Sequence, residues 1–215
     1  HGYEINLIEN KIVLFNKYPI KQFTQLIEPC IESSEDFIYR RKYTARDQIL
    51  TYQVISKKEK NILTSLQVID ELNLSRSKDD HTLQRQMGIP LSWGQTQAWN
   101  SLMYKPLYSP LVNMGEELCL FNHTANYLEF LTLEGKTQRY TPITYHENKK
   151  WQQQIFFDKK SNQVYTAFNT KKGKTIHQIN LKKGTTRPVL FLDCTFVEKM
   201  IIEDGYLFYL ESGRV

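Results

Sequence analysis

The chain has 215 residues, a net charge of +5 at pH 7 and a hydrophobic fraction of 40%, with 13 tyrosines and 11 phenylalanines. This length suits one large all-β domain or two small ones, and the aromatic and β-branched content favours strands over helices. No apolar run reaches the ~20 residues that span a bilayer. No phosphate-binding loop, nucleophile elbow or dinucleotide fingerprint is present, so nucleotide and α/β-hydrolase chemistry are not expected.

Much of the positive charge lies in five lysine pairs. Most of them fall in predicted turns, where lysine stays solvated and discourages pairing between sheet edges. No arginine-rich stripe with interleaved aromatics accompanies them, so a nucleic-acid partner is not expected. The pairs are Lys57-Lys58, Lys149-Lys150, Lys159-Lys160, Lys171-Lys172 and Lys182-Lys183.

The three cysteines, Cys30, Cys119 and Cys194, are too few and too scattered for a disulfide framework or a zinc site. Cys119 lies in the middle of a predicted strand, which suggests a small buried hydrophobe. One disulfide with one free thiol remains an alternative, so the redox compartment stays open. The chain begins at His1 without a signal-peptide pattern, which indicates processing, truncation or excision from a longer chain.

Two groups of strands are predicted before residue 70. In the first, a strand with Ile5 and Leu7 leads through a polar turn at 9–11 into strands at 12–15 and 20–27. In the second, strands at 37–39 and 49–55 are followed by a turn at 56–60 and a strand that starts at residue 61.

Residues 70–106 interrupt the strand pattern. The polar stretch 75–81 predicts a surface excursion. Ser92 is suitably placed to cap a short helix; the alternative is an irregular insertion. A long insertion in a regular array is often where function lies.

One hairpin layout occurs twice after the insertion, at residues 117–133 and 163–181. Leu133 and Leu181 are 48 residues apart, and Gly135 and Gly184 are 49 apart. Periods of ~40–50 residues with several strands per unit are the signature of β-propellers. The sequence therefore predicts an all-β, propeller-like array of about four to five antiparallel blades, in a single domain over residues 1–215.

The last predicted hairpin joins strands at 197–202 and 206–210 through Asp204-Gly205, the strongest short-range hairpin signal in the chain. The strand at 206–210 is apolar on both faces, as an inner strand between neighbouring blades is expected to be. Either the N-terminal strands complete this last blade or the chain is a fragment.

The pattern Asp204-Gly-Tyr-Leu-Phe-Tyr and the turn Leu133-Glu-Gly-Lys resemble the divergent β-propellers of the NHL and YWTD type. The resemblance covers about two-thirds of the chain and rests on pattern. Neither a YWTD tetrad nor a Trp-Asp repeat ending is present, so no functional residue is carried over. The resemblance implies blades around a central channel with binding on one rim. The expected location is secreted or in the cell envelope.

The predicted binding site is a group of aromatic residues in the insertion. Flat aromatic faces suit sugar rings or the hot spots of a protein partner. The alternative is that these aromatics plug the central channel or cover a blade edge. The leading hypothesis is a non-catalytic module that recognises a protein or a glycan without a cofactor. Its predicted binding residues are Trp93, Trp99, Tyr104, Tyr108 and Arg85, with Gln95 nearby.

The competing hypothesis is a propeller-type carbohydrate hydrolase. Such an enzyme needs two carboxyl groups ~5–9 Å apart, one of them with a raised pKa. The candidates Asp36, Glu117, Asp158 and Asp193 lie at strand starts or in turns, where carboxylates usually serve as caps. No two histidines have metal-ligand spacing, although His123 and His146 meet if both project from the rims of one blade. No catalytic residue and no metal ligand is assigned.

Overall fold

A computed structural model describes residues 2–8, 11–18, 30–44, 48–88, 92, 95, 98–99, 102–104, 107–194 and 196–211. Within these residues strands predominate, numbered β1 to β16, and are joined by helix α2 (Glu71–Gln86) and the 3-10 turn η1 (Tyr145–Glu147). The chain forms two compact units. The first comprises residues 1–67 and 71–104, and the second comprises 68–70 and 105–215.

The first unit contains a hairpin of two strands and an antiparallel sheet of four strands. The last strand of this sheet, β6, ends at Ile69, so its final two residues are grouped with the second unit. The predicted strands of residues 37–66 are confirmed. The predicted strand at 20–27 lies outside the described residues. The hairpin is β1 (Gly2–Ile8) with β2 (Lys11–Tyr18), and the sheet is β3 (Cys30–Ser33), β4 (Phe37–Thr44), β5 (Ile49–Ser56) and β6 (Ile62–Ile69).

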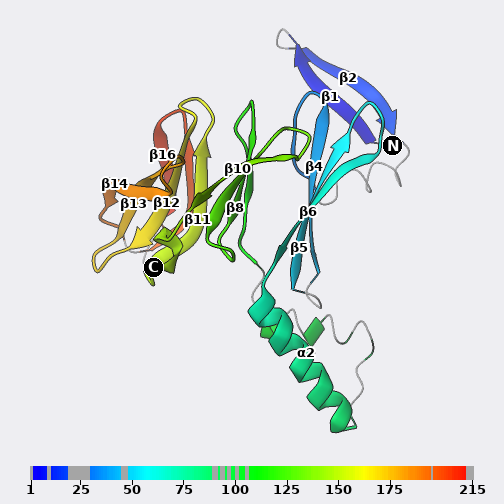
Figure 1. The fold of residues 1–215 in the computed structure, drawn as a ribbon. Coiled ribbons are helices and arrows are strands. Elements are labelled where there is room, and N and C mark those ends of the chain that lie inside the picture. The colour runs from blue at the N-terminus through cyan, green and yellow to red at the C-terminus, as the bar shows by residue number, and fades with distance from the viewer. Residues whose placement is uncertain are drawn as a thin grey trace. The chain divides into compact units, whose positions relative to one another are not determined.

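The second unit contains two four-stranded antiparallel sheets and a C-terminal hairpin, each built from strands consecutive in the chain (Figure 1). One sheet is β7 (Leu111–Asn113), β8 (Leu118–Asn122), β9 (Tyr127–Leu131) and β10 (Thr137–Pro142). The other is β11 (Trp151–Asp158), β12 (Gln163–Asn169), β13 (Lys174–Asn180) and β14 (Thr185–Leu192). The hairpin is β15 (Val197–Glu203) with β16 (Tyr206–Glu211).

The predicted repeat is confirmed at the level of its hairpins. Strands β8 and β9 pair antiparallel, as do β12 and β13, and each pair forms the second and third strands of its sheet. The all-β prediction is therefore correct for the fold class. All five lysine pairs lie in turns or bends between elements, as solvated lysines on a sheet protein should.

One turn design recurs at four hairpins of the chain. A polar side chain ends the first strand and accepts a backbone N–H from within the turn. Four residues later, just before the return strand, a residue has positive φ, a conformation that glycine and asparagine tolerate best. The pairs are Ser56 with Lys60 (φ 57°), Asn122 with Asn126 (62°), Asp158 with Asn162 (52°) and Asn180 with Gly184 (67°).

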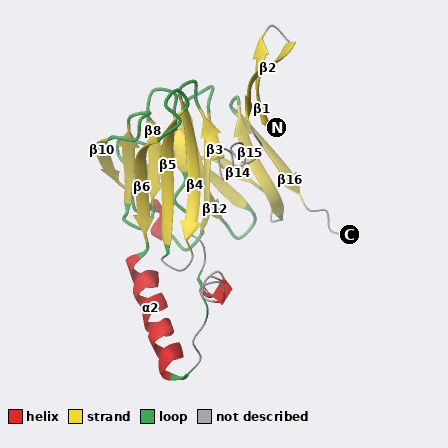
Figure 2. Cartoon of the chain, turned by 90° about the vertical axis from the view of Figure 1, so that its right-hand side faces the viewer, coloured by secondary structure: helices red, strands yellow, loops and turns green. Residues whose placement is uncertain are grey.

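Residues 75–81, expected in a surface excursion, lie inside helix α2, and most of them are exposed. Its residues are mostly good helix formers, and Glu71 in the first turn and Arg85 in the last suit the helix dipole. The predicted cap at Ser92 is confirmed, because Ser92 Oγ accepts the Gln95 N–H (3.4 Å) while Gln95 Oε1 accepts the Ser92 N–H (2.8 Å). Figure 2 shows α2 in red.

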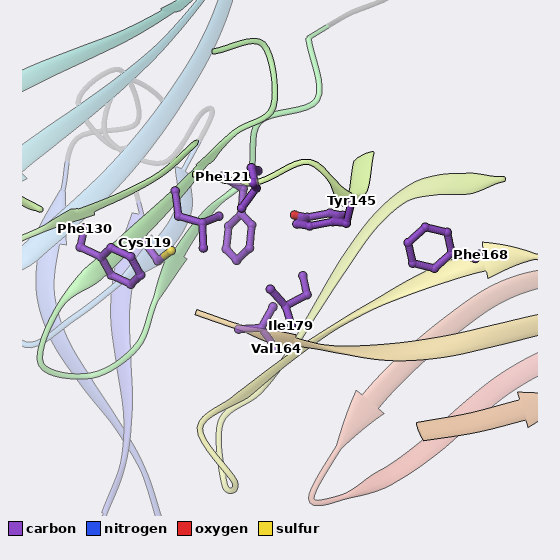
Figure 3. Packing of buried hydrophobic residues seen from close by; sticks show 9 residues of the cluster. Cys119, Phe121, Phe130, Tyr145, Val164, Phe168 and Ile179 are labelled. Carbon is purple, nitrogen blue, oxygen red and sulfur yellow. The ribbon is translucent and has the colours of Figure 1, made fainter. Parts of the chain in front are cut away.

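The sheets of the second unit pack against each other through two successive cores. The first core joins the β7–β10 sheet to the β11–β14 sheet (Figure 3). The second joins Ala167 and Ile176 of the β11–β14 sheet to Met200 and Ile202 of β15. The first core contains Cys119, Phe121, Leu128, Phe130, Ile143, Tyr145, Val164, Phe168 and Ile179.

Strand β16 differs from its predicted inner position. Among the described strands it pairs with β15 alone. Its side chains Tyr206, Phe208 and Leu210 are 68%, 58% and 60% exposed. The apolar side chains of β16 therefore form an exposed face, and the strand is not buried between two sheets.

The cysteines form no disulfide, and Cys119 is fully buried, as its position in a strand predicts. In the described part of the chain, no helix combines the length and apolarity needed to cross a membrane.

Candidate functional site

Four of the five predicted binding residues are described by the structure, and three of these, Arg85, Trp99 and Tyr104, lie in the insertion. Arg85 is exposed in the last turn of α2, and Trp99 is 41% exposed in a helical stretch. The Tyr104 hydroxyl donates to Asp80 of α2 (2.6 Å), which ties the end of the insertion to the helix. Burial and this hydrogen bond raise the pKa of Tyr104 to about 12. Trp93 lies outside the described residues.

Large apolar side chains are exposed along this insertion. Leucines and methionines supply most of them, on α2 and on the residues that follow it. We call this set the insertion surface. It consists of Leu72 (62% exposed), Leu83 (55%), Met87 (72%), Trp99 (41%), Leu102 (85%) and Met103 (57%).

Tyr108 belongs to the second unit and is part of a different cluster. Its hydroxyl accepts the backbone N–H of Ile155 (2.7 Å). Its ring stacks on His123 with 5.7 Å between ring centroids and meets Trp151 edge-on at 6.0 Å. Tyr108 therefore packs between the sheets of this unit, in contrast to the exposed Trp99.

His123 lies at the centre of this cluster. Its Nδ1 is 2.8 Å from the Tyr108 carbonyl oxygen, and its Nε2 is 2.9 Å from the Tyr145 hydroxyl. Because a carbonyl oxygen only accepts, Nδ1 carries the hydrogen and Nε2 accepts from Tyr145. Burial lowers the pKa of His123 from 6.5 to about 4, so the ring is neutral near physiological pH.

The rings of His146 and His123 lie 5.2 Å apart between centroids. His146 Nε2 is 2.9 Å from Asn126 Oδ1, and burial lowers the pKa of His146. Its Nδ1 is buried without a hydrogen-bond partner among the described residues. No group of three or more potential metal ligands occurs in the part of the chain that the structure describes.

Sequence reasoning missed Tyr145 and Trp151 as members of this cluster. Trp151 lies 4.6 Å from His123 between ring centroids, and its Nε1 donates to Thr166 Oγ1 (2.7 Å). Both residues come from the connection between two sheets and the start of β11, where no repeat position marks them. The cluster is aromatic and internally hydrogen-bonded, which suits a packing role between sheets.

Two of the four carboxylates proposed for a hydrolase, Glu117 and Asp158, have separate local partners. Glu117 makes a two-pronged ion pair with Arg139 (2.6 and 2.8 Å). Asp158 is buried at the end of β11, and Asp193 is exposed after β14. Asp36 is exposed in the first unit. Glu117 and Asp158 therefore each bind their own neighbouring residues, and these hydrogen bonds do not join one carboxylate to the other.

Asp158 ties two turns together. Its oxygens accept Ser161 Oγ (2.7 Å) and the N–H groups of Lys160 (3.2 Å), Asp204 (3.1 Å) and Gly205 (2.8 Å). The Ser161 hydrogen bond and then the backbone N–H groups hold the pKa of Asp158 below its ordinary 3.8. Stabilisation by this carboxylate is therefore present above pH 3.8 and is lost as the pH falls through the lowered pKa.

We expect Asp158→Asn to lower the denaturant midpoint of the protein. The substitution replaces an acceptor oxygen by an NH2 group that faces hydrogen-bond donors. Asp193→Asn is the matched control, because it makes the same charge change at an exposed site. Equal midpoints for the two variants, measured by denaturation followed by fluorescence, would contradict this role.

The comparisons with known proteins give no family for the chain. No protein-family model matches it, and no curated protein matches it significantly. Its function therefore has to be argued from its own residues.

Proposed function

We propose that this chain is a non-catalytic interaction module of the β-propeller type, in which the insertion surface binds a protein partner. The observation that carries the proposal is the exposure of Leu102 (85%), Met87 (72%) and four further large apolar side chains within one insertion. Exposed apolar patches mark interaction sites, and all six of these side chains fall within one insertion. The proposal thus keeps the predicted site region and extends it onto α2.

The propeller part of the proposal is supported by the order of the strands. Three four-stranded antiparallel sheets each use strands consecutive in the chain, and the β15–β16 hairpin is the start of a fourth repeat of this pattern. In the second unit the sheets pack in sequence through two apolar cores. Propeller blades are built in this way.

The chemistry of the insertion surface favours a protein over a glycan. Glycan sites combine flat aromatic faces with fixed polar groups. Here five of the six exposed apolar side chains are leucine or methionine, and the Tyr104 hydroxyl is already engaged by Asp80. Methionine adapts its shape and is frequent at protein-binding surfaces.

The hydrolase hypothesis has less support, because Glu117 is paired with Arg139 and Asp158 is a turn cap with a lowered pKa. A general acid needs the opposite shift. The structural observations therefore favour binding over this particular catalysis.

The test compares the chain with a Leu102→Asp/Met103→Asp variant. Both side chains are largely exposed, so the variant should fold with an unchanged melting temperature. After affinity capture from cells of the source organism, calorimetry with the isolated partner should give about a tenfold loss of affinity, since truncating an interface anchor costs about 1–2 kcal/mol.

The matched control is Lys171→Asp/Lys172→Asp in an exposed turn of the second unit, which should retain the partner. A partner that binds both variants equally would contradict the proposal. Binding on a glycan array that is lost in Trp99→Ala, with no protein captured, would assign the same surface to a glycan instead.

A further inference from the structure

The outer face of the β15–β16 hairpin carries an ordered pattern of exposed side chains. Met200 and Ile202 of β15 point into the core with the β11–β14 sheet, so the alternate residues Lys199, Ile201 and Glu203 lie on the opposite face. Their cross-strand partners are Leu210, Phe208 and Tyr206. Ile201 is 45% exposed, and Tyr206, Phe208 and Leu210 are 58–68% exposed.

This face continues a series of interfaces already present in the unit. The β11–β14 sheet buries one face against the β7–β10 sheet and residues of the other against the hairpin. The hairpin buries its own inner face in the same manner, and its outer face carries the exposed side chains Ile201, Tyr206, Phe208 and Leu210. The outer face of the hairpin is therefore suited to a third contact of the same kind, in which one sheet packs face to face on another.

The charged side chains on the outer face can pair with those of a second copy of the same face. Lys199 and Glu203 lie two residues to either side of Ile201 on the same strand face. A two-fold axis that runs across the strands near Ile201 places Lys199 of one copy opposite Glu203 of the other, twice per dimer. The same axis stacks Phe208 on its counterpart and places Tyr206 against Leu210.

From this geometry we infer that the outer face of the β15–β16 hairpin binds a second copy of this chain. The inference goes beyond the proposed function, because it uses neither α2 nor the insertion surface and it places a second copy where a closed ring would place the next blade. A two-stranded hairpin is smaller than a standard interface of about 1,600 Å². The dimer is therefore weak, with a dissociation constant of about 10–100 µM.

The test is sedimentation velocity of the full chain from about 2 to about 200 µM, a range that brackets this dissociation constant. The unmodified chain should shift from monomer to dimer. Lys199→Glu and Glu203→Lys should each weaken the dimer by about tenfold, since each puts like charges opposite in two symmetric pairs. The double charge exchange should restore it. Lys182→Glu, in a distant turn, is the control and should leave dimerisation unchanged.

Phe208→Asp provides a second readout at an exposed position and should leave the chain monomeric with native circular dichroism. A monomer at every concentration would overturn the inference. A dimer that none of these variants changes would also overturn it, because it would use another face. Neither result affects the proposed role of the insertion surface, which the Leu102 and Met103 substitutions test separately.

Discussion

Gly184→Ala should destabilise the second unit by about 3 kcal/mol or more, the range of substitutions that force a steric clash and strained backbone. Gly184 has φ +67° in the turn between β13 and β14. A Cβ atom added there would lie 1.8 Å from the Pro142 carbonyl oxygen and 2.9 Å from its carbon. Because Pro142 ends β10 of the adjacent sheet, the clash can be relieved only by moving backbone against backbone.

Gly205→Ala is the matched control for this prediction. Gly205 also has positive φ (+78°), but nothing lies within 4 Å of its added Cβ atom. It should lose about 1 kcal/mol, the cost of the left-handed conformation alone. Chemical denaturation of both variants isolates the contribution of the close approach, and equal losses would show that the two sheets do not meet at Pro142.

Acidification from pH 6.5 to 4 should lower the free energy of unfolding by about 3 kcal/mol through His123. The pKa of His123 is lowered in the folded state, so the unfolded chain binds the proton first. Stability is therefore complete above pH 6.5, falls as the pH approaches 4 and levels off below it. Protonation also removes the Nε2 lone pair that accepts from the Tyr145 hydroxyl.

The measurement is urea denaturation at several pH values, for the unmodified chain and for His123→Gln. The variant should be less stable at neutral pH, since it loses ring packing against Trp151 and Tyr108. Its stability should depend less on pH, by about one proton across this range. His146 and His177, whose pKa values are also lowered by burial, retain their own smaller contributions. An unchanged slope in the variant would exclude His123 as the acid-sensitive group.

The hairpins could be predicted from the sequence, because alternating strands and short polar turns are signals that lie within a few neighbouring residues. Asp204-Gly205 predicts its hairpin correctly, and residues 117–133 and 163–181 occupy equivalent strands. The recurring turn gives a further signal in the sequence, a polar residue followed four positions later by asparagine, glycine or lysine.

Helix α2 and the histidine cluster were less accessible for a physical reason. Helix α2 buries only Ser77 among its side chains, so it has no apolar stripe from which a helical period can be recognised. The cluster depends on packing between two sheets, which brings His123 onto Trp151 although they belong to different repeats. Strand β16 was misread because apolar residues on both faces describe a buried strand and an exposed one equally well.

The carboxylate of Asp158 also shows how far along the chain the folded second unit must reach. It is buried at the end of β11, yet it accepts the N–H groups of Asp204 and Gly205, about 46 residues further along the chain. A shortened chain that stopped after β14 would leave this buried carboxylate without the Asp204 and Gly205 donors. The folded second unit therefore includes Gly205, and the C-terminal hairpin is an integral part of it rather than an appendage.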